Sequence, residues 1–475
     1  MKKYLLIIAL IIAVSAIGGG CYYLFGRKDV CKNVIPKDAK AVMVLDAKQL
    51  IRQLDISIKD ILSLNKSDKD EKIGIDFLSP MYGFLSNERY LCGVFALSDA
   101  KDFEEAIKSK GVSVESQRGF NWGYSNQMMI CFNDEKALLL GPISQAESNN
   151  MRQKMVEWMT QDEQKNPYFS GLKKQDGILK VCSSLGVVPD NNLSQYVQML
   201  GSDFDLNSVL MNAAFNISDN ALTLSVGMTS DDERFDKLID QYNEQLRPIK
   251  ADLLTTNSEN PFLWFGANLD GEKLLEALRK NPLLRTALAA ANMQMDLDKF
   301  LKSIDGDVSF EFADVINTSF RNWAFKAQVN NQDFLKNVSD WDASFMSSSA
   351  KIQSLSSNNY LLSDGRSNIN FGLQDNMFYL SEGQRASAAV GNVSENSISA
   401  LKSKIKGKRW FTTIDLSRLV NKADTQSLKG DDKEKADALL GAVDRLNISM
   451  RDVGNLEFEI TTKEKTSDLI KGLLK

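Results

Sequence analysis

The stretch LDAKQLI at residues 45–51 recurs 224 positions later as LDGEKLL at residues 269–275. A third related stretch, IDLSRLV, lies at residues 414–420. In each stretch an apolar run precedes the aspartate and apolar residues follow it at helical spacing, which predicts a strand that leads into a helix. Asp46 and Asp270 are expected at the N-caps of these helices, because aspartate accepts the free amide hydrogens of a first helical turn. We assign no catalytic role to them.

Further landmarks recur in the same order at similar displacements. The apolar run at 94–97 matches the run at 325–328, and the alternating segment LTLSV at 222–226 matches LEFEI at 456–460. Such self-similarity indicates a repeated structural unit. Strands with alternating residues have one dry face, which amphipathic helices must cover. The sequence therefore predicts an α+β fold with two tandem copies of an antiparallel sheet backed by helices, after an N-terminal membrane anchor.

The 475-residue chain is longer than a single hydrophobic core usually organises. We expect a membrane anchor or signal at residues 1–28, a first α+β repeat at 29–250 and a second at 251–475. The boundary between the repeats is placed where turn-forming residues, including the run NSENP at 257–261, interrupt the periodic pattern.

The N-terminus predicts a transmembrane helix. Lys2 and Lys3 precede an uncharged apolar stretch at residues 4–25, which is long enough to span a bilayer. The competing interpretation is a lipoprotein signal, in which Cys21 would be the lipidation site because it follows Gly18-Gly19-Gly20. An N-terminal apolar segment before a large soluble body usually exports that body. We therefore expect the body to lie outside the cytoplasm, in the periplasm or at the surface, with the membrane as partner of the helix.

Composition excludes several classes of protein. The net charge is −5, and no basic stripe interleaved with aromatic residues is present, so nucleic acid is not expected as a partner. The chain contains no histidine, which excludes Ser-His-Asp and Cys-His catalysis and His-ligated metals. Motifs for nucleotides or calcium are also missing, and we expect no cofactor and no metal.

A serine enzyme without histidine could use a Ser-Lys pair. Ser-x-x-Lys occurs at Ser63–Lys66, Ser170–Lys173 and Ser399–Lys402, and three occurrences in a chain rich in both residues indicate coincidence. The triplet Ser218-Asp219-Asn220 imitates a motif of penicillin-binding enzymes, but it lies between two alternating segments, where it predicts a hairpin turn. No catalytic residue is assigned.

Four cysteines follow the anchor, and all lie in the first half of the chain: Cys31, Cys92, Cys131 and Cys182. Because the second repeat has none, the fold is not expected to need disulfides. A Cys92–Cys131 bridge is one alternative, and buried free thiols are the favoured one.

Trp122 and Tyr124 are the two candidates for an exposed aromatic contact with a partner, since they lie in a Gly-rich segment at 119–124. Packing in the core is the alternative, and it is the favoured one even here.

Three short motifs resemble a known family. They are IPKDA at 35–39, Gly74-Ile75-Asp76 with Pro80, and DAKDF at 99–103. The chain is similar in these positions to a family of Bacteroidota envelope proteins, often lipoproteins, that is catalogued as a domain of unknown function. The resemblance implies the location and the fold. It carries no functional residues to this sequence, and the imperfect lipobox at Cys21 is a departure from the lipoprotein members.

These observations predict a non-catalytic cell-envelope protein that binds a protein, peptide or glycan partner. The alternatives are a histidine-independent periplasmic hydrolase, and a carrier or chaperone with an apolar cavity. A polar cleft with clustered carboxylates would favour the hydrolase, and a large empty apolar pocket would favour the carrier.

The two modes of anchoring differ in their covalent chemistry. We expect an uncleaved transmembrane helix, so metabolic labelling with a fatty acid should give the same result for the native chain and for Cys21→Ala. Loss of label in Cys21→Ala would establish lipid attachment instead.

Overall fold

The computed structural model describes residues 29–53, 73–162, 165–187, 205–251, 261–280, 282–292, 296–316, 319–341, 349–364, 367–382, 402–420 and 431–474. The predicted anchor at residues 1–28 lies outside them. None of the helices in the described ranges has the length and hydrophobicity needed to cross a bilayer.

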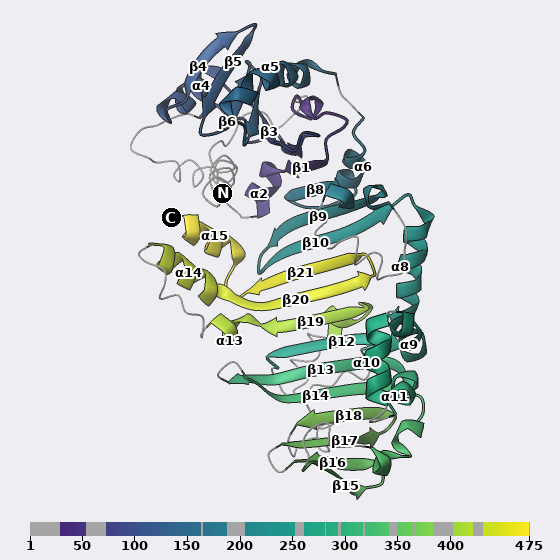
Figure 1. Cartoon of the computed structure of the whole chain (residues 1–475). Coiled ribbons are helices and arrows are strands. Elements are labelled where there is room, and N and C mark those ends of the chain that lie inside the picture. Colours follow the sequence, from purple (N-terminus) through teal and green to yellow (C-terminus); the bar gives the residue numbers. More distant parts are fainter. Residues whose placement is uncertain are drawn as a thin grey trace. The chain divides into compact units, whose positions relative to one another are not determined.

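The described residues form two compact units (Figure 1). Unit 1 contains the described residues up to Val187, then Asp205–Asp231, and finally the C-terminal segment from Thr462. Unit 2 contains the described residues of Asp232–Thr461. The expected boundary near residue 250 follows the sequence repeat, whereas the compact units assign the residues after Asp231 to unit 2 and those after Thr461 to unit 1.

Within its described residues, unit 1 combines antiparallel strands with helices on both faces of their sheet. Its elements are η1 (Lys32–Val34), β1 (Ala41–Leu45), α2 (Ala47–Gln53), β2 (Met81–Leu85), β3 (Leu91–Ala96), α4 (Ala100–Ser109), β4 (Ser113–Gln117), β5 (Phe120–Ser125), β6 (Met128–Phe132), β7 (Lys136–Gly141), α5 (Gln145–Thr160), α6 (Tyr168–Lys173), β8 (Leu179–Ser184), η2 (Leu185–Val187), η3 (Leu206–Ser208), β9 (Val209–Ser218), β10 (Ala221–Ser230) and α15 (Thr466–Leu474). The strand order is β10-β9-β8-β1-β2-β3-β7-β6-β5-β4.

Unit 2 has the same kind of architecture. Its elements are α8 (Glu233–Gln245), β11 (Leu246–Arg247), β12 (Leu263–Asp270), α9 (Gly271–Lys280), α10 (Pro282–Asn292), α11 (Leu297–Ser303), β13 (Ile304–Ile316), β14 (Ser319–Val329), η4 (Asp333–Leu335), η5 (Val338–Asp340), β15 (Lys351–Ser356), β16 (Asn359–Ser363), β17 (Asn368–Gln374), β18 (Met377–Glu382), β19 (Trp410–Asp415), α13 (Leu416–Val420), α14 (Asp431–Ala442), β20 (Val443–Asp452) and β21 (Asn455–Thr462). Side by side, its strands run β20-β19-β12-β13-β14-β18-β17-β16-β15. The short hairpin connection after β20 leads into β21, and β11 pairs with the end of β12.

The two sheets have the same order when their strands are matched in sequence. With β1 matched to β12, β2 to β13 and so on to β9 and β20, every neighbouring pair among β1 to β9 has its counterpart among β12 to β20. In both units the crossover falls at the same place, where β3 pairs with β7 and β14 pairs with β18. The predicted α+β class with antiparallel sheets and helical cover is confirmed.

Local sequence explains the strand–helix junctions. The Asp46 carboxylate accepts a hydrogen bond from the Gln49 amide at 2.9 Å, and the Asp270 carboxylate accepts one from the Lys273 amide at 3.2 Å. Asp415 caps α13 in the same way. The predicted N-caps at Asp46 and Asp270 are therefore confirmed.

The sheet of unit 1 is apolar on both faces. One face carries Val42, Phe84 and Leu140 and packs against η1, α5 and α6. The other face carries Leu45 and Phe95 and packs against α2, α4 and α15. In this part of the chain the sheet is the middle of three layers, as is common for larger domains.

The sheet of unit 2 has one apolar face. It carries Ala267, Val308 and Ala327, which pack against Phe300 of α11 and Phe334 of η4. Figure 1 shows α9, α10 and α11 beside β12, β13 and β14. Among the described residues, the opposite face has a small apolar cluster centred on Trp264 and Phe411.

The N-caps give a quantitative test of the junctions. Asp46→Ala and Asp270→Ala should each lower the free energy of unfolding by about 1 kcal/mol, because each leaves amide hydrogens of a first helical turn without an acceptor. Chemical denaturation measures this, and the Asn substitutions should retain most of the stability. Asp134→Ala, in the turn before β7, is the control. An equal loss in the control would show that the caps have no special role.

Candidate functional site

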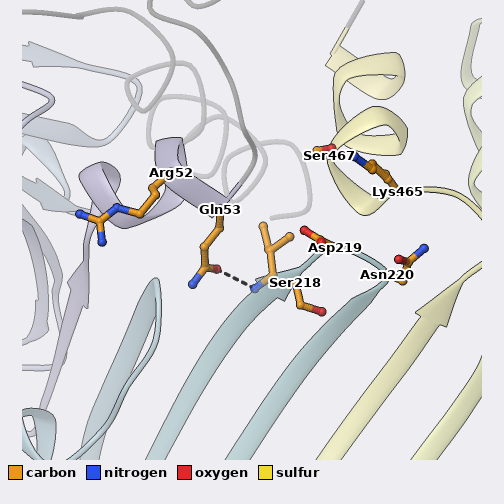
Figure 2. A pocket seen from close by; sticks show the side chains of 8 residues that line it. Arg52, Gln53, Ser218, Asp219, Asn220, Lys465 and Ser467 are labelled. Atoms are coloured by element: carbon orange, nitrogen blue, oxygen red, sulfur yellow. Dashed lines mark hydrogen bonds between the residues drawn. The ribbon is translucent and has the colours of Figure 1, made fainter.

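A polar pocket of about 550 Å³ lies in unit 1, which is within the usual size range for small-ligand sites. The end of α2, the β9–β10 hairpin and the start of the C-terminal segment surround it (Figure 2). Its lining residues are Arg52, Gln53, Ile217, Ser218, Asp219, Asn220, Lys465 and Ser467.

Hydrogen bonds hold two walls of the pocket together. The Gln53 side chain accepts a hydrogen bond from the Ile217 amide at 3.0 Å, and this contact is drawn in Figure 2. Gln53 Nε2 also donates to the Asn216 side chain at 3.5 Å. Because both groups of Gln53 are used, the end of α2 is fixed against β9.

The third wall is fixed by the carbonyl groups of the β9–β10 turn. The Asp219 carbonyl accepts from the Thr466 amide at 2.7 Å, and the Asn220 carbonyl accepts from the Thr462 amide at 2.9 Å. Asn220 Nδ2 donates to the Glu464 carbonyl at 3.3 Å. The turn therefore positions Lys465 and Ser467 at the pocket.

The pocket has a positive bias in an acidic protein. Its lining contains the cations Arg52 and Lys465 and the single carboxylate of Asp219, all exposed to solvent. The ion pairs seen in the described part of the chain involve none of these three side chains. A ligand could therefore use these charges without breaking any ion pair among the described residues.

The structure places the Ser-Asp-Asn triplet in a turn, as predicted. Ser218 pairs with Ala221 across the hairpin, and its hydroxyl donates to the Ala221 carbonyl at 3.2 Å. Ser170 lies in α6, and its hydroxyl donates to the Pro167 carbonyl at 2.7 Å. Both hydroxyls serve the backbone. The pairs Ser63–Lys66 and Ser399–Lys402 lie wholly or partly outside the described residues.

Trp122 and Tyr124, the two candidates for an exposed aromatic contact, lie on the side of β5 that faces the core. Trp122 is only 3% exposed, and the Arg152 guanidinium lies 5.3 Å from its ring centre. Tyr124 is half-buried, and its hydroxyl donates to the Ile143 carbonyl at 3.1 Å. The prediction of an exposed contact at Trp122 is therefore wrong, because the inward-facing residues of β5 complete the apolar face of the sheet. The alternative interpretation, packing, is correct for this residue.

The four cysteines are buried free thiols, as expected. Burial raises the pKa of Cys31 and Cys131 to about 12 and that of Cys182 to about 11. Burial also raises the pKa of Cys92. These thiols are not activated nucleophiles. Within the described ranges, no group of three cysteine or acidic residues is arranged to hold a metal ion.

A second polar region, which sequence reasoning missed, covers one face of the unit 2 sheet. Residues paired across neighbouring strands share a face, and on this face they are mostly polar and buried: Asn268, Asp307, Ser309, Glu311, Lys326, Ser381, Thr413, Asp415, Asn447 and Ser449. The equivalent face of unit 1 is apolar. The alternating polar residues of β13 and β20 indicate that one face of this sheet is polar, which is common for antiparallel strands.

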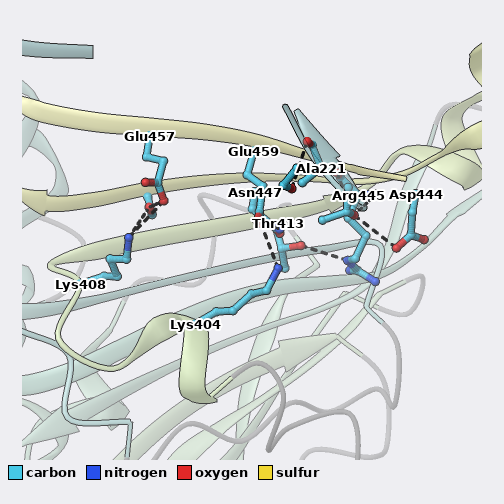
Figure 3. Close-up of polar contacts among 12 residues, drawn as sticks. Ala221, Lys404, Lys408, Thr413, Asp444, Arg445, Asn447, Glu457 and Glu459 are labelled. Carbon is cyan, nitrogen blue, oxygen red and sulfur yellow. Dashed lines mark hydrogen bonds and ion pairs between the residues drawn. The ribbon is translucent and has the colours of Figure 1, made fainter. Parts of the chain in front are cut away.

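Part of this polar face is a fully paired network (Figure 3). Glu459 accepts from Lys404 Nζ at 2.9 Å and from Asn447 Nδ2 at 2.7 Å. Lys408 Nζ donates to Ser449 at 3.0 Å and to Glu457 at 3.3 Å. These pairs connect the segment at 402–408 to β20 and β21.

Arg445 ties the same network to the start of β12. Its guanidinium donates to Thr413 Oγ1 at 3.0 Å and to the Pro261 carbonyl at 2.9 Å. Burial lowers the pKa of Arg445, and the neighbouring Asp415 and Asp444 carboxylates offset part of that effect. Buried charge is tolerated here because each charged group has partners.

Another part of the face, around Lys326, is less completely paired. Lys326 lies directly opposite Ser309 on β13 and Tyr379 on β18, with Glu311 and Ser381 as diagonal neighbours. Burial lowers the pKa of Lys326, and the Glu311 carboxylate offsets part of that change. The Ser381 hydroxyl is buried and makes no hydrogen bond to the described residues.

The Lys404–Glu459 pair has a pH dependence that can be measured. Burial alone would raise the pKa of Glu459, but the hydrogen bonds from Lys404 and Asn447 outweigh burial and lower it below its usual value of 4.5. A lowered folded pKa stabilises the fold above pH 4.5, and the benefit is lost as pH falls. Lys404→Met should therefore lower the free energy of unfolding by about 1 kcal/mol at pH 7, a modest amount because the pair is partly exposed to solvent. The loss should be smaller at pH 3.5, because more of Glu459 is then protonated and uncharged.

Urea unfolding at the two pH values provides the measurement, with Lys406→Met as a control for the loss of one exposed positive charge. The same cost at both pH values would contradict the assigned role of Glu459.

Solved structures offer only distant similarities. Crystal form IV of TP0453 is 13% identical, with 42% of this chain and 80% of that chain covered and a TM-score of 0.26. Crystal form I is 12% identical, with 47% and 88% covered and a TM-score of 0.28. Crystal form III is 13% identical, with 45% and 85% covered and a TM-score of 0.27.

No curated protein matches the chain. The family described as "Domain of unknown function (DUF4836)" matches residues 65–468, which include most of both units. The resemblance to a domain of unknown function, drawn from three short motifs, is confirmed by this match. The chain therefore belongs to the family Domain of unknown function (DUF4836).

Proposed function

We propose that this chain is a non-catalytic cell-envelope protein that binds a partner through the pocket of unit 1. The observation that carries the proposal is the pocket itself, with its volume of about 550 Å³ and its charged, solvent-exposed lining. The proposed location outside the cytoplasm rests on the uncharged apolar stretch at residues 4–25.

The lining favours a peptide or protein partner that presents a carboxylate. Arg52 and Lys465 offer two positive charges, and Ser467 offers a neutral hydroxyl group. The Ser218 hydroxyl and the Asn220 amide nitrogen already donate to backbone carbonyls. Guanidinium and ammonium groups bind carboxylates through charge-assisted hydrogen bonds. A carrier of apolar cargo suits this site less well, because Ile217 is the only purely apolar side chain among the described residues that line it.

We also propose that the body is a tandem duplication of one unit. Three observations support it: the matched strand orders, the crossover at the equivalent strands, and the N-caps at Asp46 and Asp270. The pocket has no duplicated counterpart in sequence, because Gln53 corresponds to Ala277 in the repeat, which has no side-chain amide to bind a neighbouring strand.

A histidine-independent hydrolase is the second candidate, and Lys326 is the observation in its favour. A buried lysine with a lowered pKa can act as a general base, and Ser309 and Ser381 lie on the neighbouring strands. Turnover of an ester reporter that Lys326→Met abolishes, with an unchanged circular dichroism spectrum, would favour this candidate.

The binding proposal predicts a charge-dependent interaction. A fluorescent peptide rich in glutamate should bind the purified full-length chain with an affinity that falls as salt rises, because exposed charges are screened. The double variant Arg52→Glu/Lys465→Glu should bind at least about tenfold more weakly, since it turns two attractive contacts into repulsive ones.

Lys101→Glu/Lys108→Glu on α4 is the matched control, because it makes the same change of net charge on another surface of unit 1. Equal weakening in both double variants would show a nonspecific charge effect and would refute the pocket as the site.

A further inference from the structure

The C-terminal segment, residues 462–474, completes unit 1 although it follows the last strand of unit 2. Thr462 and Thr466 are buried, and their hydroxyls lie 3.2 Å apart. Their amides donate to the carbonyls of Asn220 and Asp219 in the β9–β10 turn. Both backbone and side chains of this segment are therefore integrated into unit 1.

Helix α15 then covers apolar surface of the same unit. Leu469 is buried, and Ile470 packs against the cluster formed by Leu45, Ile217 and their neighbours. Burial of such side chains stabilises the unit because it removes apolar surface from water. Without α15, this apolar surface of unit 1 would face water.

In unit 2, helix α8 lies beside α9, β11 and β12, although it follows the last strand of unit 1. Phe235 and Leu238 of α8 are buried. The Arg409 guanidinium donates to the Asn243 carbonyl at 2.5 Å, and Asn243 Oδ1 accepts from the Val453 amide at 2.9 Å. Lys273 of α9 pairs with Glu244 at 2.9 Å.

The helices are equivalent in the repeat. Each follows the second strand of a long hairpin, β9–β10 before α8 and β20–β21 before α15. We propose that the two units exchange these closing helices, so that α8 completes unit 2 and α15 completes unit 1. Exchange of identical elements is how domain-swapped dimers form, and here both partners belong to one chain.

The exchange of closing helices rests on the proposed duplication and does not depend on any ligand. It identifies the surface of unit 1 under α15 as the docking surface for the closing helix of a repeat. In the intact chain the surface is filled by the chain's own α15.

Hydrogen–deuterium exchange on the full-length chain tests which unit each helix completes. Leu469→Asp should raise exchange about tenfold or more at residues 41–53 and 209–230, because these segments lie under α15, and should leave β12–β14 unchanged. Leu238→Asp in α8 should have the reverse pattern. Asp468→Asn and Lys237→Ala, on the exposed sides of the same helices, are the matched controls.

Increased exchange in the unit that precedes each helix in sequence would overturn the proposal. If a variant unfolds entirely, a second experiment takes its place. A protease site is inserted within residues 252–260 of the otherwise native chain, and the chain is cleaved there. After cleavage the two fragments should elute together from a size-exclusion column. The N-terminal fragment carries α8, which completes unit 2, and the C-terminal fragment carries α15, which completes unit 1. Elution as two separate folded fragments would also overturn the proposal.

Discussion

The constraint on which this structure depends is that a wide antiparallel sheet has two faces, and each must be covered or supplied with polar partners. Unit 1 meets it with apolar side chains on both faces and helices on each. Unit 2 has an apolar face covered by helices on one side of its sheet only. Its other face buries Asp307 and Asn447 among polar partners, and Glu459 beside them is half-buried. Hydrogen bonds and ion pairs on this face replace the helical cover that unit 1 receives from α5 and α6.

This exchange of apolar for polar contacts changes the energetics of unit 2. A paired buried charge contributes little net stability, but loss of one partner leaves the other charge buried and is costly. The charged groups around Glu459 and Arg445 have hydrogen-bond partners, so the network adds little net stability. Its main effect is to fix the position of the segment at 402–408 on the sheet. Near Lys326 the Ser381 hydroxyl is buried without a partner among the described residues.

The sequence predicts the local parts of this fold well, because they follow from short-range chemistry. Asp46 and Asp270 cap helices, Ser218-Asp219-Asn220 forms a turn, and the cysteines are buried thiols, all as their patterns indicate. Trp122 shows the limit of such reasoning, because a glycine beside an aromatic residue fits a tight hairpin as well as an exposed bend. The pocket could not be predicted, since Gln53, Asn220 and Lys465 are brought together only by tertiary contacts.

The position of the closing helices is hidden from sequence for the same reason: periodicity reveals that α15 is amphipathic but not which sheet its apolar side covers. Its docking also creates the pocket, since Lys465 and Ser467 reach the site only when Thr462 and Thr466 bind the β9–β10 turn. A ligand that contacts Lys465 and Ser467 binds only the form in which α15 is docked. Docking therefore raises the affinity for the ligand, and the ligand stabilises docking by the same free energy. Under the proposed function, binding of a partner and docking of α15 are therefore thermodynamically linked.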